Sequence, residues 1–333
     1  MKVYPIKFKP ILKEKIWGGH KLGSLLSKDT NKDNIGESWE ISDVNGNISE
    51  VSNGIYQGTN IKDLIVAHEA AFLGANNFQH FGHNFPLLIK FLDANTDLSV
   101  QVHPDNEMAK IQHNSFGKTE MWYIMDSDED ANIVIGLKDK NTNPKILNHI
   151  TSDNVEAVFN REIVKKGDSF FIPAGKIHAI GAGVLAAEIQ QTSDITYRVY
   201  DWDRKDDQGE KRELHTQLAE QATKHFESNG KAEYQLQSNK STNLVNCDYF
   251  TTNIINVNDT FEKNYENLDS FIIFMCVEGT ASITAGGITE TLKIGETILL
   301  PAETKEIVFS SHNAKLLEVY IDGDLSKTLL KAS

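Results

Sequence analysis

Short apolar runs separated by Gly, Asn and Asp make up most of this chain, and they predict a mainly β structure. The runs are rich in Val, Ile, Phe and Tyr, and several alternate with polar residues, as strands do when one face is buried. We expect strands at residues 98–103, 121–125, 132–137, 168–172 and 195–202, with the same pattern resuming from 250 to 321.

Two stretches instead carry apolar residues at helical spacing. Residues 59–75 place Ile61, Leu64 and Phe72 on one side after a Thr-Asn start, which predicts a helix. Residues 212–226 repeat Leu or Ala every four positions, which predicts a second helix. The expected fold is therefore mainly β, with a few helices in the N-terminal part.

Polar stretches between these elements indicate how the chain divides. We expect loops or linkers at residues 27–34, 138–148, 205–211 and 227–243. The last stretch is the best boundary, so we expect an N-terminal unit of residues 1–235 with helical insertions, and a compact C-terminal β unit of residues 236–333.

An internal repeat supports two related β units. The segment GDSFFIPA, from Gly167 to Ala174, matches GETILLPA, from Gly295 to Ala302, at eight aligned positions by identity or by conservative type. A glycine turn followed by an apolar strand is a common pattern by itself. Because both copies end in the same Pro-Ala, we favour a true duplication.

Three places in the N-terminal unit carry residues suited to binding a metal ion. The run LSVQVHP alternates strictly, so a strand there turns Ser99, Gln101 and His103 to one face. Alone, this pattern also fits a solvent-facing strand with one histidine. Glu120, just before the apolar run MWYIM, and His178, which follows a Pro-Ala-Gly turn, supply the partners that a metal site needs.

The spacing of these residues resembles the cupin superfamily. The second cupin motif is matched at Gly167, Pro173, Gly175 and His178, whereas the first is matched loosely, with Gln101 in place of its first histidine. The sequence motifs around these residues narrow the resemblance to the type I phosphomannose isomerases, especially their short bacterial branch. The matching blocks are IWGG, GESWEIS, QVHP, GKTEMWY, PAGKIHAIG and EIQQTSDITYRVYDWDR.

This resemblance implies a bicupin fold, with two jelly-roll units, and one zinc ion per chain. The implied zinc ligands are Gln101, His103, Glu120 and His178. It further implies Lys118, Glu188 and Arg198 as catalytic residues, and Ser99 and Arg204 as contacts to the substrate phosphate. The implied activity is the interconversion of mannose 6-phosphate and fructose 6-phosphate, by proton transfer through an enediolate.

Several alternatives stay open. The proton acceptor is Lys118, Glu188 or a water molecule assisted by Arg198, and Glu188 and Arg204 also fit solvated charges at a strand edge and in an exposed loop. Another metal-dependent cupin enzyme acting on a sugar phosphate is a second hypothesis, with an oxygenase as one form of it. A non-catalytic sugar-binding bicupin is the third.

The C-terminal copy of the repeat lacks the metal-binding residues. The position that corresponds to His178, five residues after the proline, is Glu306, and no Gln-x-His pair precedes it. We therefore expect the C-terminal unit to hold no metal and to support the first unit.

Composition excludes several classes of partner. The 33 basic and 47 acidic side chains give a net charge of −14, which repels nucleic acid and anionic membranes. The longest apolar run, residues 271–277, is too short to span a bilayer, and two cysteines make no disulfide framework. With no secretory signal at the N-terminus, we expect a cytoplasmic monomer or homodimer that binds a small sugar phosphate.

Overall fold

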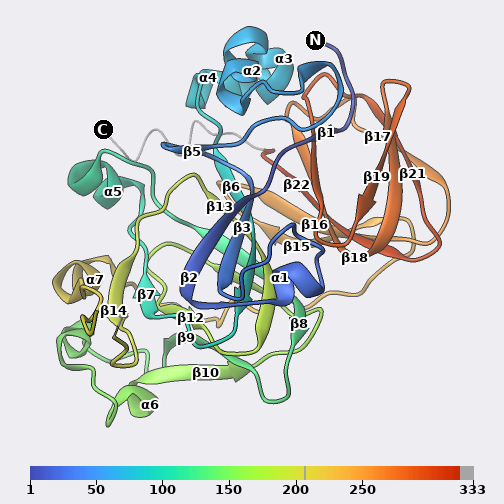
Figure 1. Ribbon diagram of the computed structural model, residues 1–333. Helices are drawn as coiled ribbons and strands as arrows, with labels where there is room; N and C mark the ends of the chain where they lie inside the picture. The colour runs from blue at the N-terminus through green and yellow to red at the C-terminus, as the bar shows by residue number, and fades with distance from the viewer. Residues whose placement is uncertain (206–207, 323–333) are drawn as a thin grey trace.

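The computed structural model describes residues 1–205 and 208–322. Two β units lie side by side, with short helices packed at one end (Figure 1). The mainly β architecture expected from the apolar pattern is confirmed.

The first unit contains two antiparallel sheets that face each other. The six-stranded sheet has the order β11 (Ser169–Ile172), β8 (Glu120–Ser127), β13 (Val184–Gln191), β6 (Leu87–Ala94), β2 (Ile11–Gly19) and β3 (Ile35–Ile41). The five-stranded sheet has the order β10 (Phe159–Ile163), β9 (Asn132–Leu137), β12 (His178–Ile180), β7 (Val100–Val102) and β14 (Tyr197–Tyr200).

An apolar core fills the space between these two sheets. Trp122 and Leu92 from the larger sheet pack in one cluster with Ile133, Ile135 and Ile180 from the smaller one. Successive side chains of a strand point to opposite faces, so the same strands also present polar residues at the end of this core. The candidate site lies there.

The second unit is built on a nine-stranded antiparallel sheet. Its main path is β1 (Ile6–Lys7), β20 (Thr297–Leu300), β18 (Ile272–Ala285), β22 (Ala314–Tyr320), β16 (Thr251–Val257) and β15 (Ser241–Asn246). The long strand β18 also pairs with β19 (Ile288–Lys293) and β21 (Glu306–Ser310), and β21 pairs with β17 (Phe261–Asn264). Strand β1 comes from the start of the chain, so the N-terminal segment completes this sheet. The boundary between residues 235 and 236 stays a prediction.

The two copies of the internal repeat adopt the same local structure. Gly167 and Gly295 have φ angles of 93° and 82°, in the left-handed region that glycine adopts without strain. Each is followed by a four-residue strand, β11 or β20, and then by Pro-Ala. Glu306, which replaces the histidine of the first copy, is exposed at the start of β21.

The helix predicted at 59–75 is wrong in its extent, because the segment breaks into three short helices. These are α2 (Ile61–His68), α3 (Ala70–Leu73) and α4 (Ala75–Phe81), and the Asn60 side chain caps the first by accepting from the Asp63 N–H at 2.8 Å. The breaks fall at Glu69 and Gly74, which have φ angles of 44° and 95°. At Gly74 the chain touches the second unit so closely that a Cβ would lie 2.2 Å from the Asp269 carbonyl oxygen.

The second predicted helix, at 212–226, is shorter than expected, and several short helices lie where none was predicted. Only α7 (Thr216–Ala222) is helical. The residues before it are held by β14 and by the residue that follows β14: the Glu213 carbonyl accepts from Arg198, and Arg212 pairs with Asp201. Among the described residues, the longest of these is α5 (Asn106–His113), capped by Asp105. The remaining short elements are α1 (Lys21–Ser24), β4 (Asp43–Val44), β5 (Asn47–Ile48), η1 (Gly54–Tyr56), η2 (Pro144–His149) and α6 (Val155–Val158).

Two of the predicted loops differ from the structure or extend beyond the residues it describes. The loop predicted at 138–148 contains most of η2, and the one predicted at 205–211 falls partly outside the described residues.

In the part of the chain that the structure covers, no helix has both the length and the apolar character that crossing a membrane requires.

Aromatic packing joins the two units. Phe85 and Phe271 are fully buried, and their ring centroids lie 4.8 Å apart. Replacing Phe85 by Ala should lower the free energy of unfolding by about 3–5 kcal/mol, because the cavity removes contacts with both units. Urea unfolding followed by tryptophan fluorescence measures this change. Ile55→Ala, at a side chain 66% exposed, is the control and should stay within about 0.5 kcal/mol of the parent.

Candidate active site

The five-stranded sheet aligns three of the expected site residues in a row across its strands. In register, His178 on β12 lies opposite Gln101 on β7, and Gln101 lies opposite Arg198 on β14. Directly paired residues of neighbouring strands point to the same face of a sheet. His103 follows β7 and adds a second imidazole, with its Nε2 atom 3.1 Å from Nε2 of His178.

The six-stranded sheet contributes a second set of polar residues. Glu120 begins β8 and is paired in register with Gln190 on β13. Farther along the same face, four residues form a row across β8, β13, β6 and β3: Trp122, Glu188, Lys90 and Trp39. The two sheets therefore bring the predicted metal ligands Gln101, His103, Glu120 and His178 to one place.

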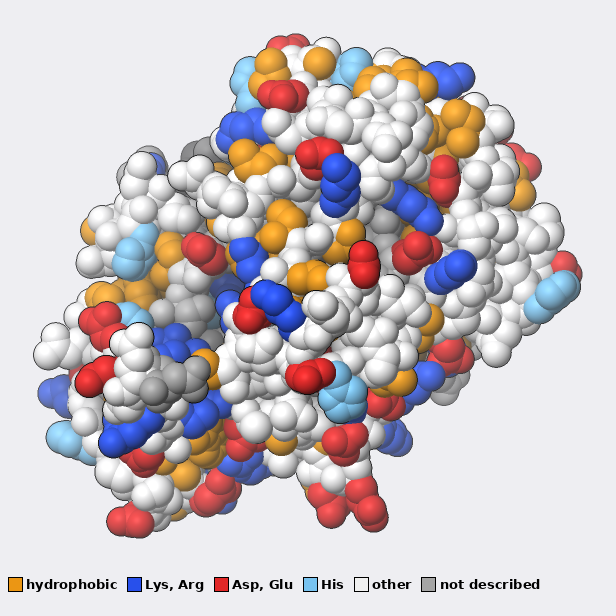
Figure 2. All heavy atoms as spheres, in the orientation of Figure 1, with side chains coloured by type: hydrophobic (Ala, Val, Ile, Leu, Met, Phe, Trp, Pro, Cys, Tyr) orange, Lys and Arg blue, Asp and Glu red, His pale blue; other side chains and the backbone are white. Residues whose placement is uncertain are grey.

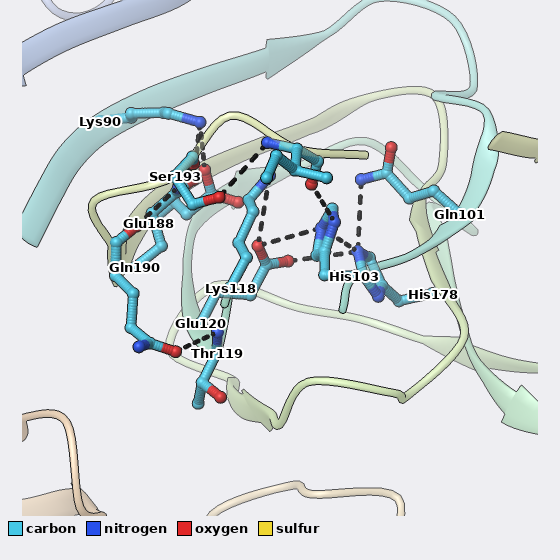
Figure 3. Close-up of polar contacts among 12 residues, drawn as sticks. Lys90, Gln101, His103, Lys118, Thr119, Glu120, His178, Glu188, Gln190 and Ser193 are labelled. Carbon is cyan, nitrogen blue, oxygen red and sulfur yellow. Dashed lines mark hydrogen bonds and ion pairs between the residues drawn. The ribbon is translucent and has the colours of Figure 1, made fainter. Parts of the chain in front are cut away.

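Three of these side chains are close enough to hold a metal ion. The candidate ligand atoms of His103, Glu120 and His178 all lie within 4.8 Å of one another. The Glu120 oxygens are 3.4 Å from His103 Nε2 and 3.3 Å from His178 Nε2 (Figure 3). All three residues are at most 1% exposed, so water does not surround this cluster.

Backbone carbonyls fix the tautomer of both imidazoles. His103 Nδ1 lies 2.9 Å from the Ile195 carbonyl oxygen, and His178 Nδ1 lies 2.8 Å from that of Lys176. A carbonyl only accepts hydrogen bonds, so both Nδ1 atoms carry the proton and both Nε2 atoms present lone pairs. Burial lowers the pKa of both histidines, which favours the neutral form that binds metals.

The cluster is incomplete without a cation. Within the described chain, neither oxygen of Glu120 has a hydrogen-bond partner, although both are buried. Two Nε2 lone pairs and a carboxylate that converge in a dry site repel one another, and a buried carboxylate without hydrogen-bond partners is costly. A divalent metal ion among them would satisfy all three groups. The donor set of imidazole nitrogen and carboxylate oxygen fits such an ion.

Gln101 lies at the edge of the cluster as the fourth predicted ligand. Its side-chain Nε2 is 3.2 Å from His178 Nε2. The nitrogen and oxygen of a carboxamide exchange places by a half-turn of the group, and their assignment follows from the hydrogen-bond network. Binding to a metal requires the oxygen to face the cluster, and that half-turn provides it.

Lys118 approaches the same oxygen of Glu120 as His103 does. Its Nζ atom is 3.7 Å from Glu120 Oε2, and the side chain is 7% exposed. Burial lowers the pKa of Lys118, since removal from water disfavours the ammonium form, although Glu120 opposes this effect. A lysine whose charged form is disfavoured can exchange a proton more readily than one on the surface.

Glu188 is held on both sides within the row of four residues. Trp122 donates its indole N–H to Glu188 Oε1 at 2.9 Å, and Lys90 pairs with Oε2 at 3.0 Å. Burial alone would lower the pKa of Lys90, but Glu188 and Glu37 outweigh it and raise the pKa above its ordinary value. Lys90 therefore keeps its charge, and the contacts with Trp122 and Lys90 fix the Glu188 side chain in place.

Comparison with known proteins agrees with this geometry. Residues 6–161 match the family model of the type I phosphomannose isomerase catalytic domain, and residues 240–321 match that of the mannose-6-phosphate isomerase cupin domain. Mannose-6-phosphate isomerase ManA of Bacillus subtilis is 36% identical over 90% of this chain and 94% of its own length. The chain belongs to the type I phosphomannose isomerase family.

Other relatives and solved structures support the same assignment. The mannose-6-phosphate isomerase of Streptococcus mutans is 35% identical, over 92% of this chain and 95% of its own. The crystal structure of the Bacillus subtilis enzyme superposes with a TM-score of 0.83 at 34% identity, covering 95% and 99% of the two chains. The apo enzyme of Salmonella typhimurium, 16% identical with a TM-score of 0.77 over 96% and 99%, shares the fold. The cupin fold predicted from sequence is confirmed.

The predicted catalytic residue Arg198 and the predicted phosphate contacts Ser99 and Arg204 lie on or next to the neighbouring strands β7 and β14. Arg198 donates from Nη1 to the Glu213 carbonyl at 2.8 Å, while its buried Nε has no partner among the described residues. Arg204 pairs with Asp201 at 2.6 Å and donates to the Asp97 carbonyl at 2.5 Å, so its guanidinium braces a loop. Ser99 is buried just before β7. Their roles toward phosphate stay predictions.

Lys90 is a site residue that the sequence analysis missed. It interrupts the otherwise apolar run LLIKFL, and the whole strand β6 is buried. A lysine within a buried apolar run signals an internal ion pair, because an unpaired ammonium there would be too costly. That signal was available in the sequence, but only the fold shows that Glu188 is its partner.

Proposed function

We propose that this chain is a zinc-dependent mannose-6-phosphate isomerase, which interconverts D-mannose 6-phosphate and D-fructose 6-phosphate. Membership of the family supports the reaction, and the unsatisfied Glu120 carboxylate between two oriented imidazoles supports the metal. Gln101, His103, Glu120 and His178 would hold one zinc ion. Two neutral imidazoles, one amide and one carboxylate leave such a site with one net positive charge.

The bound metal would supply Lewis-acid stabilisation of negative charge that develops on the sugar's first two oxygens during isomerisation. The chain's own side chains must carry out the proton transfer. A proton must leave the carbon next to the carbonyl and return to the neighbouring carbon, through an enediolate. Such a transfer needs one acceptor close to the substrate and a site that excludes water.

The geometry favours Lys118 as the acceptor. Its Nζ stands beside the metal cluster, and burial has lowered its pKa. Glu188 has both oxygens occupied by Trp122 and Lys90, so it is better suited to shaping the charge of the site than to accepting a proton. We assign Lys118 the proton transfer and Glu188 the positioning of its neighbours.

Arginines supply the positive charge that a sugar phosphate needs. Arg198, Arg204 and Arg212 gather around Asp201, and Lys and Arg side chains crowd this part of the first unit (Figure 2). The guanidinium fork matches phosphate geometry and keeps its charge at neutral pH. We propose that Arg198 and Ser99 contact the phosphate and that Arg204 contributes from the loop it braces.

Removal of the metal tests this proposal directly. Exhaustive chelation should abolish the production of fructose 6-phosphate from mannose 6-phosphate in a coupled assay, and added Zn²⁺ should restore it. Full activity in metal-free protein would contradict the proposal. Zinc binding without turnover would move the function to another sugar phosphate or to binding alone, and oxygen consumption would indicate an oxygenase instead.

A further inference from the structure

A pocket separate from the metal cluster lies at the end of β9 in the first unit. It has a volume of about 570 Å³ and lies between the loop that follows β9 and the segment that follows α7. None of the predicted zinc ligands or catalytic residues lines it. Its size is within the range of small-molecule sites, roughly 300–1,000 Å³.

The walls of this pocket are basic, in a protein that is acidic overall. Four lysines line it against two carboxylates, those of Asp139 and Glu227, and the whole chain carries a charge of −14. The four are Lys138, Lys140, Lys176 and Lys224. Lys140 and Lys224 already have partners, since they pair with Glu227 at 2.8 Å and with Asp105 at 2.6 Å. Both ion pairs are exposed enough for water and other anions to compete.

Lys176 has no such partner. It is 4% exposed, and its Nζ donates to the Ser228 carbonyl at 2.8 Å and lies 5.5 Å from the centre of the Phe226 ring. Across the described residues, no carboxylate is in ion-pair contact with it. A buried ammonium has three N–H donors and is costly without a counter-charge. An anion in the pocket would supply both the missing charge and the missing acceptors.

We propose that this pocket binds the phosphate group of a small phosphorylated metabolite, with Lys176 as its central contact. The amide side chains of Asn141, Asn160 and Asn229 line the same space and can bond to hydroxyl groups of the ligand. The site shares no residue with the proposed substrate site, so it goes beyond the isomerase reaction.

Equilibrium dialysis of the zinc-loaded full-length protein against labelled inorganic phosphate tests the proposal. The parent should bind two phosphates per chain, one in the substrate site and one in the pocket. Lys176→Met keeps the aliphatic packing over Phe226 but removes the charge. It should weaken phosphate binding in the pocket at least about tenfold. Glu227→Gln, which removes a carboxylate from the pocket wall, should strengthen it.

Lys145→Met, at an exposed lysine outside the pocket, makes the same charge change and should leave phosphate binding unchanged in both the substrate site and the pocket. Zinc content and melting temperature establish that each variant is folded. An isotherm for Lys176→Met that coincides with that of the parent would overturn the proposal. If the parent binds one phosphate and Lys176→Met binds none, the pocket is supported and phosphate binding in the substrate site is not.

Discussion

Replacing His178 by Ala should remove both the metal and the activity of this protein. The side chain supplies one of three buried candidate ligand atoms that lie within 4.8 Å of one another. Loss of an outer-shell partner of a metal ligand commonly costs 10–100-fold in affinity or activity, so loss of a ligand should exceed about 100-fold. Metal analysis of the purified protein and the coupled isomerase assay measure the two effects together.

His312→Ala is the matched control, because His312 is an exposed histidine of the second unit. It should keep one zinc ion and full turnover. Wild-type zinc content in the His178 variant would show that the His103–Glu120–His178 cluster is not the metal site, whatever happens to the activity. Wild-type activity with no zinc would instead show that the metal takes no part in the mechanism.

Lys118→Met should leave zinc in place and lower the turnover number by about 10²–10⁴-fold, the usual contribution of a positioned acid or base. The change removes the proposed proton acceptor but keeps the buried aliphatic chain beside Glu120. Incorporation of deuterium from heavy water into the sugar phosphate follows the proton transfer itself, apart from binding and release. It should fall together with the turnover number.

Glu188→Gln and Lys110→Met complete this experiment. Lys110 is exposed on α5, so its replacement should have no effect. Glu188→Gln keeps the hydrogen bond from Trp122 but leaves Lys90 without its buried counter-charge, so it should lower stability as well as rate. If deuterium exchange survives in Lys118→Met and disappears in Glu188→Gln, the assignment of the proton acceptor must be reversed.

The sequence predicts those features of the site that depend on short-range order. The alternation of LSVQVHP places Gln101 and His103 on one face of a strand, and the structure has β7 there. The spacing from Pro173 to His178 likewise places an imidazole at the start of β12. That these strands are neighbours came from the family resemblance, since no local pattern determines which strands pair.

The features that the sequence did not predict depend on distant contacts. The break at Gly74 exists because the chain there meets Asp269 of the second unit, which helical periodicity does not record. Lys90 finds its counter-charge in Glu188, 98 residues later in the chain, through the register of β6 and β13. Tertiary contacts therefore override local propensity at these positions.

The pairing of β1 with β20 has a consequence for how the protein acquires its structure during synthesis. Ile6 is opposite Leu299, so β1 must wait until β20, made almost 300 residues later, before the two can pair. Closing a loop of that length delays folding, because its entropy is lost before the contact forms. A truncated chain that ends before β20 should consequently leave the edge of β1 that faces β20 unpaired, a property that makes degradation of incomplete copies easier.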